Sequence, residues 1–208
     1  MTPIDIDEFL PEVKTFARAC PDPVARRFIR EAARELCQRG RFWRERDAFD
    51  VRTPDCEGIC SFEDASIDVI EWAMIDDLEL EPKSPTWLDN WRADWATTDE
   101  VGTAKFITQL SPNSVTIVPK QSGRLKVRYS LLPSRTAMTL PEFLLEQFAT
   151  EIGKGAAGRI LVMPNTEYTN PQLGSAYVAE FKSLLDTLAV KAAKGQQNAP
   201  LRTKGQYF

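Results

Sequence analysis

The 208-residue sequence predicts an α+β, mainly α fold: a helical bundle with an inserted antiparallel β region and an extended C-terminal tail. Two observations lead to this class. Apolar residues recur at helical spacing near both ends of the chain, and two-residue alternation broken by turn formers fills the middle. We therefore expect residues 1–48 and 134–195 to form the bundle, residues 49–133 the β-rich insertion, and residues 196–208 the tail.

The clearest helix is expected from Asp22 to Gly40. Asp22 is suited to accept hydrogen bonds from the first-turn amides, Pro23 fits the next position, and Gly40 is a natural end. Four apolar residues recur every four positions and predict its buried face, Val24, Phe28, Ala32 and Leu36, and this stripe is broadened by Ala25, Ala33 and Cys37. The opposite face is basic, and is either solvated or turned toward a partner: it carries Arg26, Arg30 and Arg34.

In the central region apolar and polar residues alternate, as they do in half-buried strands. We expect strands at four places: residues 67–75, 105–110, 114–119 and 124–132. The turn sequence Gln121-Ser122-Gly123 predicts that the last two form a hairpin. Between the strands, Trp87, Trp91 and Trp95 are four residues apart. On one helix they would form an aromatic ridge that either covers the sheet or docks a partner, since Trp is enriched where partners bind.

Two more helices are expected after residue 139. Thr139 and Glu142 match a capping box that would open the first of them. This helix then becomes rich in glycine, which either allows another backbone to approach closely or loosens the helix: Gly153, Gly155 and Gly158. Asn170 is expected to cap the last helix, whose buried face consists of Tyr177, Phe181, Leu184, Leu185 and Leu188.

The tail has too few apolar residues and no regular period, so it is not expected to fold alone. It carries Arg202 and Lys204 and ends in Tyr207 and Phe208. Such a segment is either frayed or becomes ordered on a partner, and its aromatic end favours a partner.

Composition restricts the function. A net charge of −4 argues against binding nucleic acid by massed phosphate neutralisation. No apolar run is long enough to span a bilayer, and the acidic N-terminus does not resemble a signal peptide, so we expect the protein to stay in the compartment where it is made. The chain has no histidine, which removes the commonest general base and zinc ligand.

Catalysis is therefore not expected, and neither is a metal or cofactor. No recognised catalytic or phosphate-binding motif occurs, and the four cysteines lack a second pair at zinc-site spacing: Cys20, Cys37, Cys56 and Cys60. Two alternatives stay open. One is an enzyme that cleaves cell walls with carboxylates from residues 76–89, and the other is a DNA-binding regulator that uses the basic face with Arg26, Arg30 and Arg34.

Two stretches carry a resemblance to a known family. The opening LPEVKTFARACPDPVARRFIREAARELCQRGRFWRE and the closing LPEFLLEQFATEIGKGAAGRILVMPNTEYTNPQLGSAYVAEFKSLLDTLAVKAAKG resemble the helical segments of the head-to-tail adaptor proteins of tailed bacteriophages, also called connector or head completion proteins. The resemblance covers about half the chain, and the central strands match only in kind.

The resemblance implies a structural virion protein at the neck of the capsid, made in the cytoplasm of the bacterial host. Adaptors of this family form a ring, typically of about twelve copies, that joins the portal protein to tail or nozzle proteins. Double-stranded DNA passes through the ring during packaging and ejection without sequence-specific binding. The C-terminal extension commonly contacts the portal, which here implies portal-binding roles for Arg202, Lys204, Tyr207 and Phe208.

Overall fold

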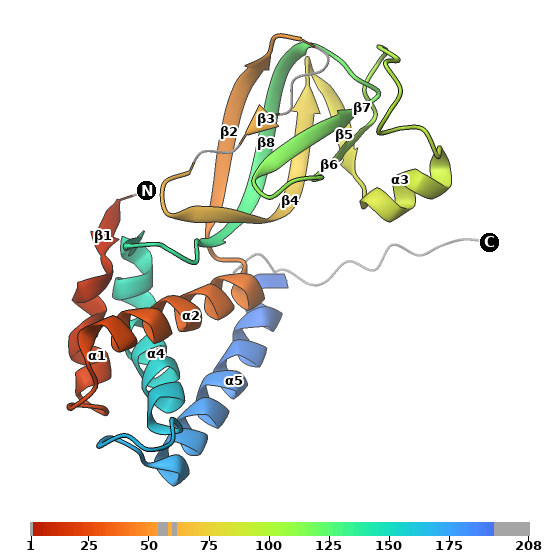
Figure 1. Ribbon diagram of the computed structural model, residues 1–208. Coiled ribbons are helices and arrows are strands. Elements are labelled where there is room, and N and C mark those ends of the chain that lie inside the picture. The colour runs from red at the N-terminus through yellow and green to blue at the C-terminus, as the bar shows by residue number, and fades with distance from the viewer. Residues whose placement is uncertain (1, 54–57, 60–61, 194–208) are drawn as a thin grey trace. The chain divides into compact units, whose positions relative to one another are not determined.

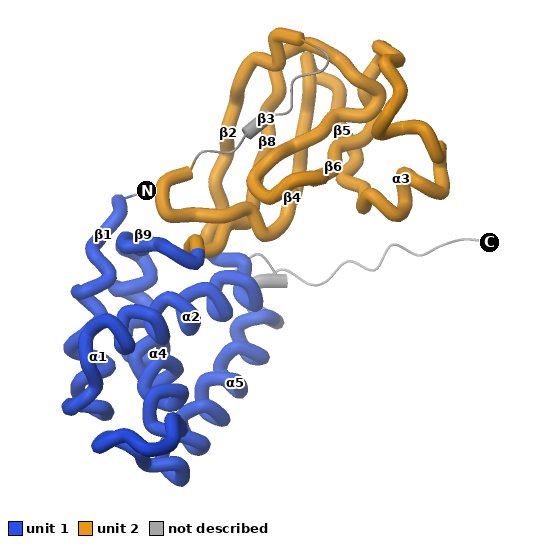
Figure 2. The backbone as a smooth tube through the Cα atoms, in the orientation of Figure 1, with its two compact units in different colours: residues 1–42, 135–208 blue, residues 43–134 orange. Residues whose placement is uncertain are grey.

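The computed structural model describes residues 2–53, 58–59 and 62–193, so the tail and its four candidate portal-binding residues lie outside the described part of the chain. The chain divides into two compact units, shown in Figure 1 and Figure 2. Unit 1 consists of residues 1–42 and 135–208, and unit 2 of residues 43–134. The second unit is thus an insertion between the two halves of the first.

Unit 1 is built around three long helices. Its elements are β1 (Pro3–Asp5), η1 (Ile6–Phe9), α1 (Leu10–Lys14), α2 (Asp22–Gly40), β9 (Thr139–Pro141), α4 (Glu142–Leu161) and α5 (Pro171–Ala193). Helix α4 packs against both α2 and α5. Strand β1 pairs antiparallel with β9, and the amide of Glu142 donates to the carbonyl of Thr2 at 3.0 Å. Strand β1 is therefore fixed beside the start of α4.

The expected buried face of α2 is confirmed at Ala25, Ala32, Ala33, Leu36 and Cys37 and is wrong at Val24 and Phe28. Its buried residues are Ala25, Ile29, Ala32, Ala33, Leu36, Cys37 and Gly40, whereas Val24 and Phe28 are only half-buried. Asp22 does not cap the helix: Pro21 is the N-cap, and the Asp22 carboxylate pairs with the Lys14 ammonium at 2.7 Å. The predicted boundaries are confirmed, but the helix rests on Ile29 rather than on Phe28.

Helices α4 and α5 approach closely at two glycines. A Cβ atom on Gly158 would lie 3.1 Å from the carbonyl oxygen of Gly174, and one on Gly174 would lie 2.8 Å from that of Gly158. Of the two roles considered for the glycines of α4, close backbone approach is therefore the observed one at Gly158. The predicted cap of the last helix is confirmed, since the Asn170 side chain accepts from the amide of Leu173 at 3.2 Å.

The capping box predicted at Thr139 is wrong. Residues 139–141 form strand β9, and α4 begins at Glu142 with no side-chain cap. Thr139 pairs with Asp5 from the far end of the sequence. This long-range pairing holds the Thr139 backbone in a strand, and no local signal could reveal it.

Unit 2 is a curled sheet with one short helix (Figure 1). Its elements are β2 (Arg44–Val51), β3 (Gly58–Ile59), β4 (Ala65–Ile75), β5 (Leu78–Pro82), α3 (Pro85–Trp91), β6 (Phe106–Thr108), β7 (Ser114–Val118) and β8 (Gly123–Pro133). The described strands form a seven-stranded sheet in the order β2-β8-β4-β5-β6-β7-β3. Strand β4 is irregular at two places, where its register against β8 shifts.

The predicted mainly α class is wrong. Of the described residues, 41% are helical and 28% are in strands, and the larger sheet is mixed rather than antiparallel. Strands β5 and β6 are parallel because the connection between them, which contains α3, crosses over and returns in the same direction. The predicted hairpin is also wrong: β7 pairs with β6 and β3, whereas β8 lies between β2 and β4.

Candidate partner-binding surfaces

Helix α3 positions the tryptophans that the sequence singled out. It begins after Ser84, whose hydroxyl oxygen accepts from the amide of Trp87 at 3.2 Å, and Pro85 occupies its first position. It ends at Trp91 because Arg92 has extended backbone angles. Trp95 therefore lies beyond the helix, and the single ridge of three tryptophans predicted from their spacing does not form.

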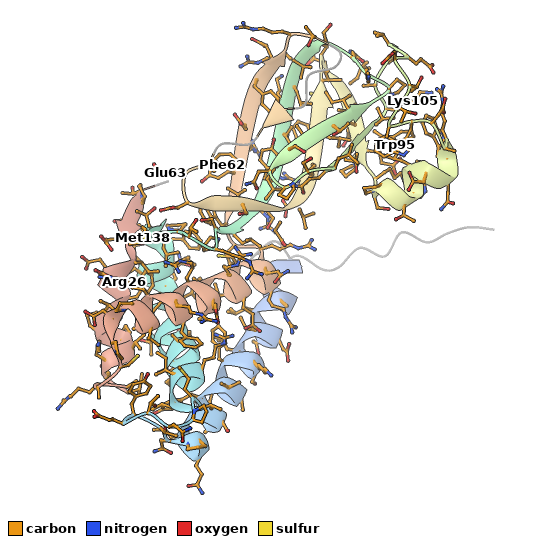
Figure 3. The ribbon with its side chains drawn as sticks, viewed as in Figure 1. Arg26, Phe62, Glu63, Trp95, Lys105 and Met138 are labelled. Atoms are coloured by element: carbon orange, nitrogen blue, oxygen red, sulfur yellow. The ribbon has the colours of Figure 1, made fainter. Side chains whose placement is uncertain are left out.

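Trp95 belongs to the core of unit 2. It is 5% exposed and packs in a cluster with Leu88 and Val118. Its indole nitrogen donates to the Asp89 carboxylate at 2.8 Å, so its polar atom is satisfied. Figure 3 shows it beside α3. Of the two roles considered for the tryptophans, covering the sheet is the one that Trp95 has.

Trp87 and Trp91 are exposed instead. Their exposed fractions are 39% and 41%, and each ring meets the ring of Phe106 edge-on with centroids 5.1 Å apart. We call Trp87, Trp91 and Phe106 the aromatic patch. The Lys83 ammonium lies 4.4 Å from the centre of the Trp87 ring, which adds a cation–π contact at the edge of the patch. Docking of a partner by these two tryptophans stays a prediction.

Phe106 was not anticipated as part of this surface. It lies in a three-residue strand, and it reaches the two tryptophans because β6 pairs in parallel with β5, placing Phe106 opposite Glu81. The tryptophan spacing indicated a surface, but only the strand pairing identifies its third member.

Two arginines of the basic side of α2, Arg26 and Arg30, make contacts within unit 1. Arg26, labelled in Figure 3, donates two hydrogen bonds to the Asp7 carboxylate, at 2.5 and 2.6 Å. This pairing lowers the pKa of Asp7 and raises that of Arg26. The Arg30 guanidinium donates to the carbonyl of Ala137 at 2.8 Å. Both arginines therefore have partners within unit 1. This disfavours the alternative of a DNA-binding regulator, in which these arginines would bind DNA.

The carboxylates of residues 76–89 are also tied into the fold. Asp76 accepts from the amide of Arg124 at 2.8 Å, and Glu81 pairs with Lys83 at 2.6 Å. The Asp77 carboxylate lies 3.8 Å from the Lys126 ammonium, and the Asp89 carboxylate accepts a hydrogen bond from the Trp95 indole nitrogen. These contacts give structural roles to Asp76, Asp77, Glu81 and Asp89, four of the five carboxylates of this segment, and give no support to the cell-wall enzyme alternative.

Two cysteines are described, Cys20 and Cys37, and both are buried. Burial raises the pKa of the Cys20 thiol, so it is a poor nucleophile near neutral pH. Cys56 and Cys60 lie outside the described residues. Among the residues that are described, no group of three or more cysteine, aspartate or glutamate side chains is placed to hold a metal ion.

Comparison with known proteins returned no matching protein-family model and no matching curated protein. None of the helices in the described ranges has the length and apolar character that crossing a membrane requires.

Proposed function

We propose that this protein is a head-to-tail adaptor of a tailed bacteriophage, a structural protein that forms a ring joining the portal protein to the tail. In this role it is not an enzyme. Its partners are the portal, tail or nozzle proteins and further copies of itself, and double-stranded DNA passes through the ring. Its place is the neck of the virion, after synthesis in the host cytoplasm.

One observation supports the proposal most. The two stretches that resemble adaptor helices are separated by about ninety residues of sequence, yet α2 from the first and α4 and α5 from the second pack together in unit 1. A resemblance limited to two unrelated helices would carry little weight. Two stretches that together build one compact unit are more consistent with a shared architecture.

Portal binding by the tail is the most accessible test. Full-length protein and a version ending at Gly195 are each sedimented with portal rings from the same genome. The proposal expects the full-length chain to sediment with the portal and the shortened chain to remain in solution.

Point variants refine this test. Replacing Arg202, Lys204, Tyr207 and Phe208 by alanine should remove binding, whereas replacing Thr203 and Gln206 in the same segment should not. Binding by the shortened chain would place the portal contact elsewhere. Binding by neither chain would remove the main reason for the adaptor proposal.

A further inference from the structure

The outer side of α2 carries a hollow of about 910 Å³ that we call the arginine groove. Its lining consists of Arg27, Arg30, Glu31, Arg34, Glu35, Gln38, Arg39 and Arg135. The lining holds five arginines and two glutamates, and Asp186 of α5 pairs with Arg39 at 3.3 Å, so an excess of positive charge remains. The groove lies opposite the buried stripe of α2 that contains Ile29 and Leu36, so it faces away from the core of unit 1.

Three contacts account for the shape and charge of the groove. The bond from Arg30 to the carbonyl of Ala137 holds the segment before β9 beside α2, which brings the exposed Arg135 to the rim. Both glutamates are already paired within unit 1: Glu31 with Arg27 at 3.0 Å, and Glu35 with Arg159 of α4. The groove is therefore suited to carboxylates supplied from outside the unit.

A second surface of unit 1 has the opposite charge. It consists of Glu8 of η1, Glu12 of α1, and Glu142 and Glu146 of α4, which we call the glutamate surface. Among the described residues none of these four carboxylates has an ion-pair partner, and all but the half-buried Glu12 are exposed. Both η1 and α1 pack on α4, so the four side chains come from adjoining elements.

The two surfaces lie on different sides of unit 1. The groove is on the side of α2 opposite its buried stripe, with Glu35 at its edge reaching Arg159 of α4, and Figure 1 shows α2 crossing α4. Glu142 and Glu146 lie one turn apart on α4, away from its buried residues Leu144, Phe148 and Ile152. One copy therefore presents a basic surface in one direction and an acidic surface in another.

We propose that the arginine groove of one copy receives the glutamate surface of a second copy. Because the two surfaces differ, the contact is head-to-tail. A pair of copies keeps one unused groove and one unused glutamate surface, so further copies add until a ring closes. Complementary charge fixes the orientation of the neighbours and makes their association sensitive to salt. This inference rests on the proposed ring-forming function and names the surfaces that build the ring.

A charge-swap experiment tests the contact in free solution without portal. Self-association of the full chain is measured by sedimentation velocity at low ionic strength, up to the highest soluble protein concentration. Arg34→Glu/Arg135→Glu reverses the groove, and Glu8→Lys/Glu146→Lys reverses the glutamate surface. Glu142 is left unchanged because a lysine in the first turn of α4 would oppose the helix dipole.

Each double variant should associate at least about tenfold more weakly than wild type, because like charges then meet across the contact. The chain with all four changes, and an equal mixture of the two double variants, should recover association. Arg18→Glu/Lys182→Glu alters charge by the same amount as the groove variant at exposed sites outside both surfaces, and should associate like wild type.

Three results would overturn this contact: no self-association of the wild type, unchanged association of both double variants, or no recovery with all four changes. Arg34→Gln/Arg135→Gln removes the charges without reversing them, and it replaces the groove variant if that variant does not fold. Since the assay contains no portal, loss of this contact with portal binding intact counts against the inference alone. Intact self-association without portal binding counts against the proposed function.

Discussion

Arg26 of α2 and Asp7 of η1 are joined by two parallel hydrogen bonds, from Nε to Oδ1 and from the terminal Nη2 to Oδ2. The pair connects the N-terminal segment to the longest helix of the first half of unit 1. Its geometry is the fork arrangement that arginine and carboxylate favour. The same segment is held at its other end by the pairing of β1 with β9.

The Arg26–Asp7 pair predicts how stability depends on pH. Because the pair lowers the pKa of Asp7 in the folded protein, its contribution is fully present above the unfolded pKa of about 4 and is lost as the pH falls through the lower folded value. Asp7→Asn should therefore be less stable than wild type near neutral pH, and the difference should shrink in acid. Urea unfolding at a series of pH values measures this.

Glu8→Gln is the matched control for that experiment, since Glu8 is the exposed neighbour of Asp7 and has no ion-pair partner among the described residues. It should show little loss near neutral pH. An Asp7→Asn difference that stays constant down to strongly acidic pH would show that the effect does not come from the ionised carboxylate.

The crossing of α4 and α5 predicts that Gly158→Ala is destabilising. Alanine in a helix is favoured over glycine by about 1 kcal/mol, but the new methyl group would lie 3.0 Å from the backbone nitrogen of Val178. Overpacking of this kind costs about 1–3 kcal/mol, so a net loss is expected. Gly102→Ala, where the nearest atom is 3.8 Å away, should change stability little by comparison. Equal effects of both changes in chemical denaturation would contradict the close approach.

Phe181→Ala and Phe28→Ala should differ, although the sequence pattern treats both residues as core. Phe181 is 3% exposed and lies against Gly155, so its loss should reduce the free energy of unfolding by about 3–5 kcal/mol. Phe28 is only half-buried, and its ring lies beneath the Arg27 guanidinium at the surface. Its loss should cost less, and chemical denaturation that gave equal values would contradict this description of α2.

The three tryptophans should separate into two classes. Trp95→Ala should destabilise unit 2 by about 3–5 kcal/mol, because its ring is buried and its indole nitrogen is bonded. Trp87→Ala and Trp91→Ala should cost less stability. If the aromatic patch docks a tail component, these two changes should weaken capture of that component while thermal unfolding of the protein stays close to that of wild type.

Local signals in the sequence predicted the helices well. The boundaries of α2 and the cap of α5 at Asn170 follow from nearby residues, because caps and apolar periodicity act within a few residues. The same periodicity placed Phe28 in the core. Four-residue spacing fits two adjacent stripes on this helix, and only packing against α4 selects the one through Ile29.

The sheet was predicted less well because strand partners are set by distant residues. Alternation located most of β4, β7 and β8, yet it contained no information on which strand pairs with which. Strand β8 lies between β2 and β4, and the amide of Arg124 at its start is bonded to Asp76 of the turn after β4. The parallel pair and the aromatic patch depend on the same kind of long-range contact.

Electron microscopy of portal rings incubated with the full-length protein tests the adaptor proposal most directly. The proposal predicts added density in the form of a second ring, coaxial with the portal and continuing its channel. Portal rings that remain bare at saturating concentrations of the protein would contradict it.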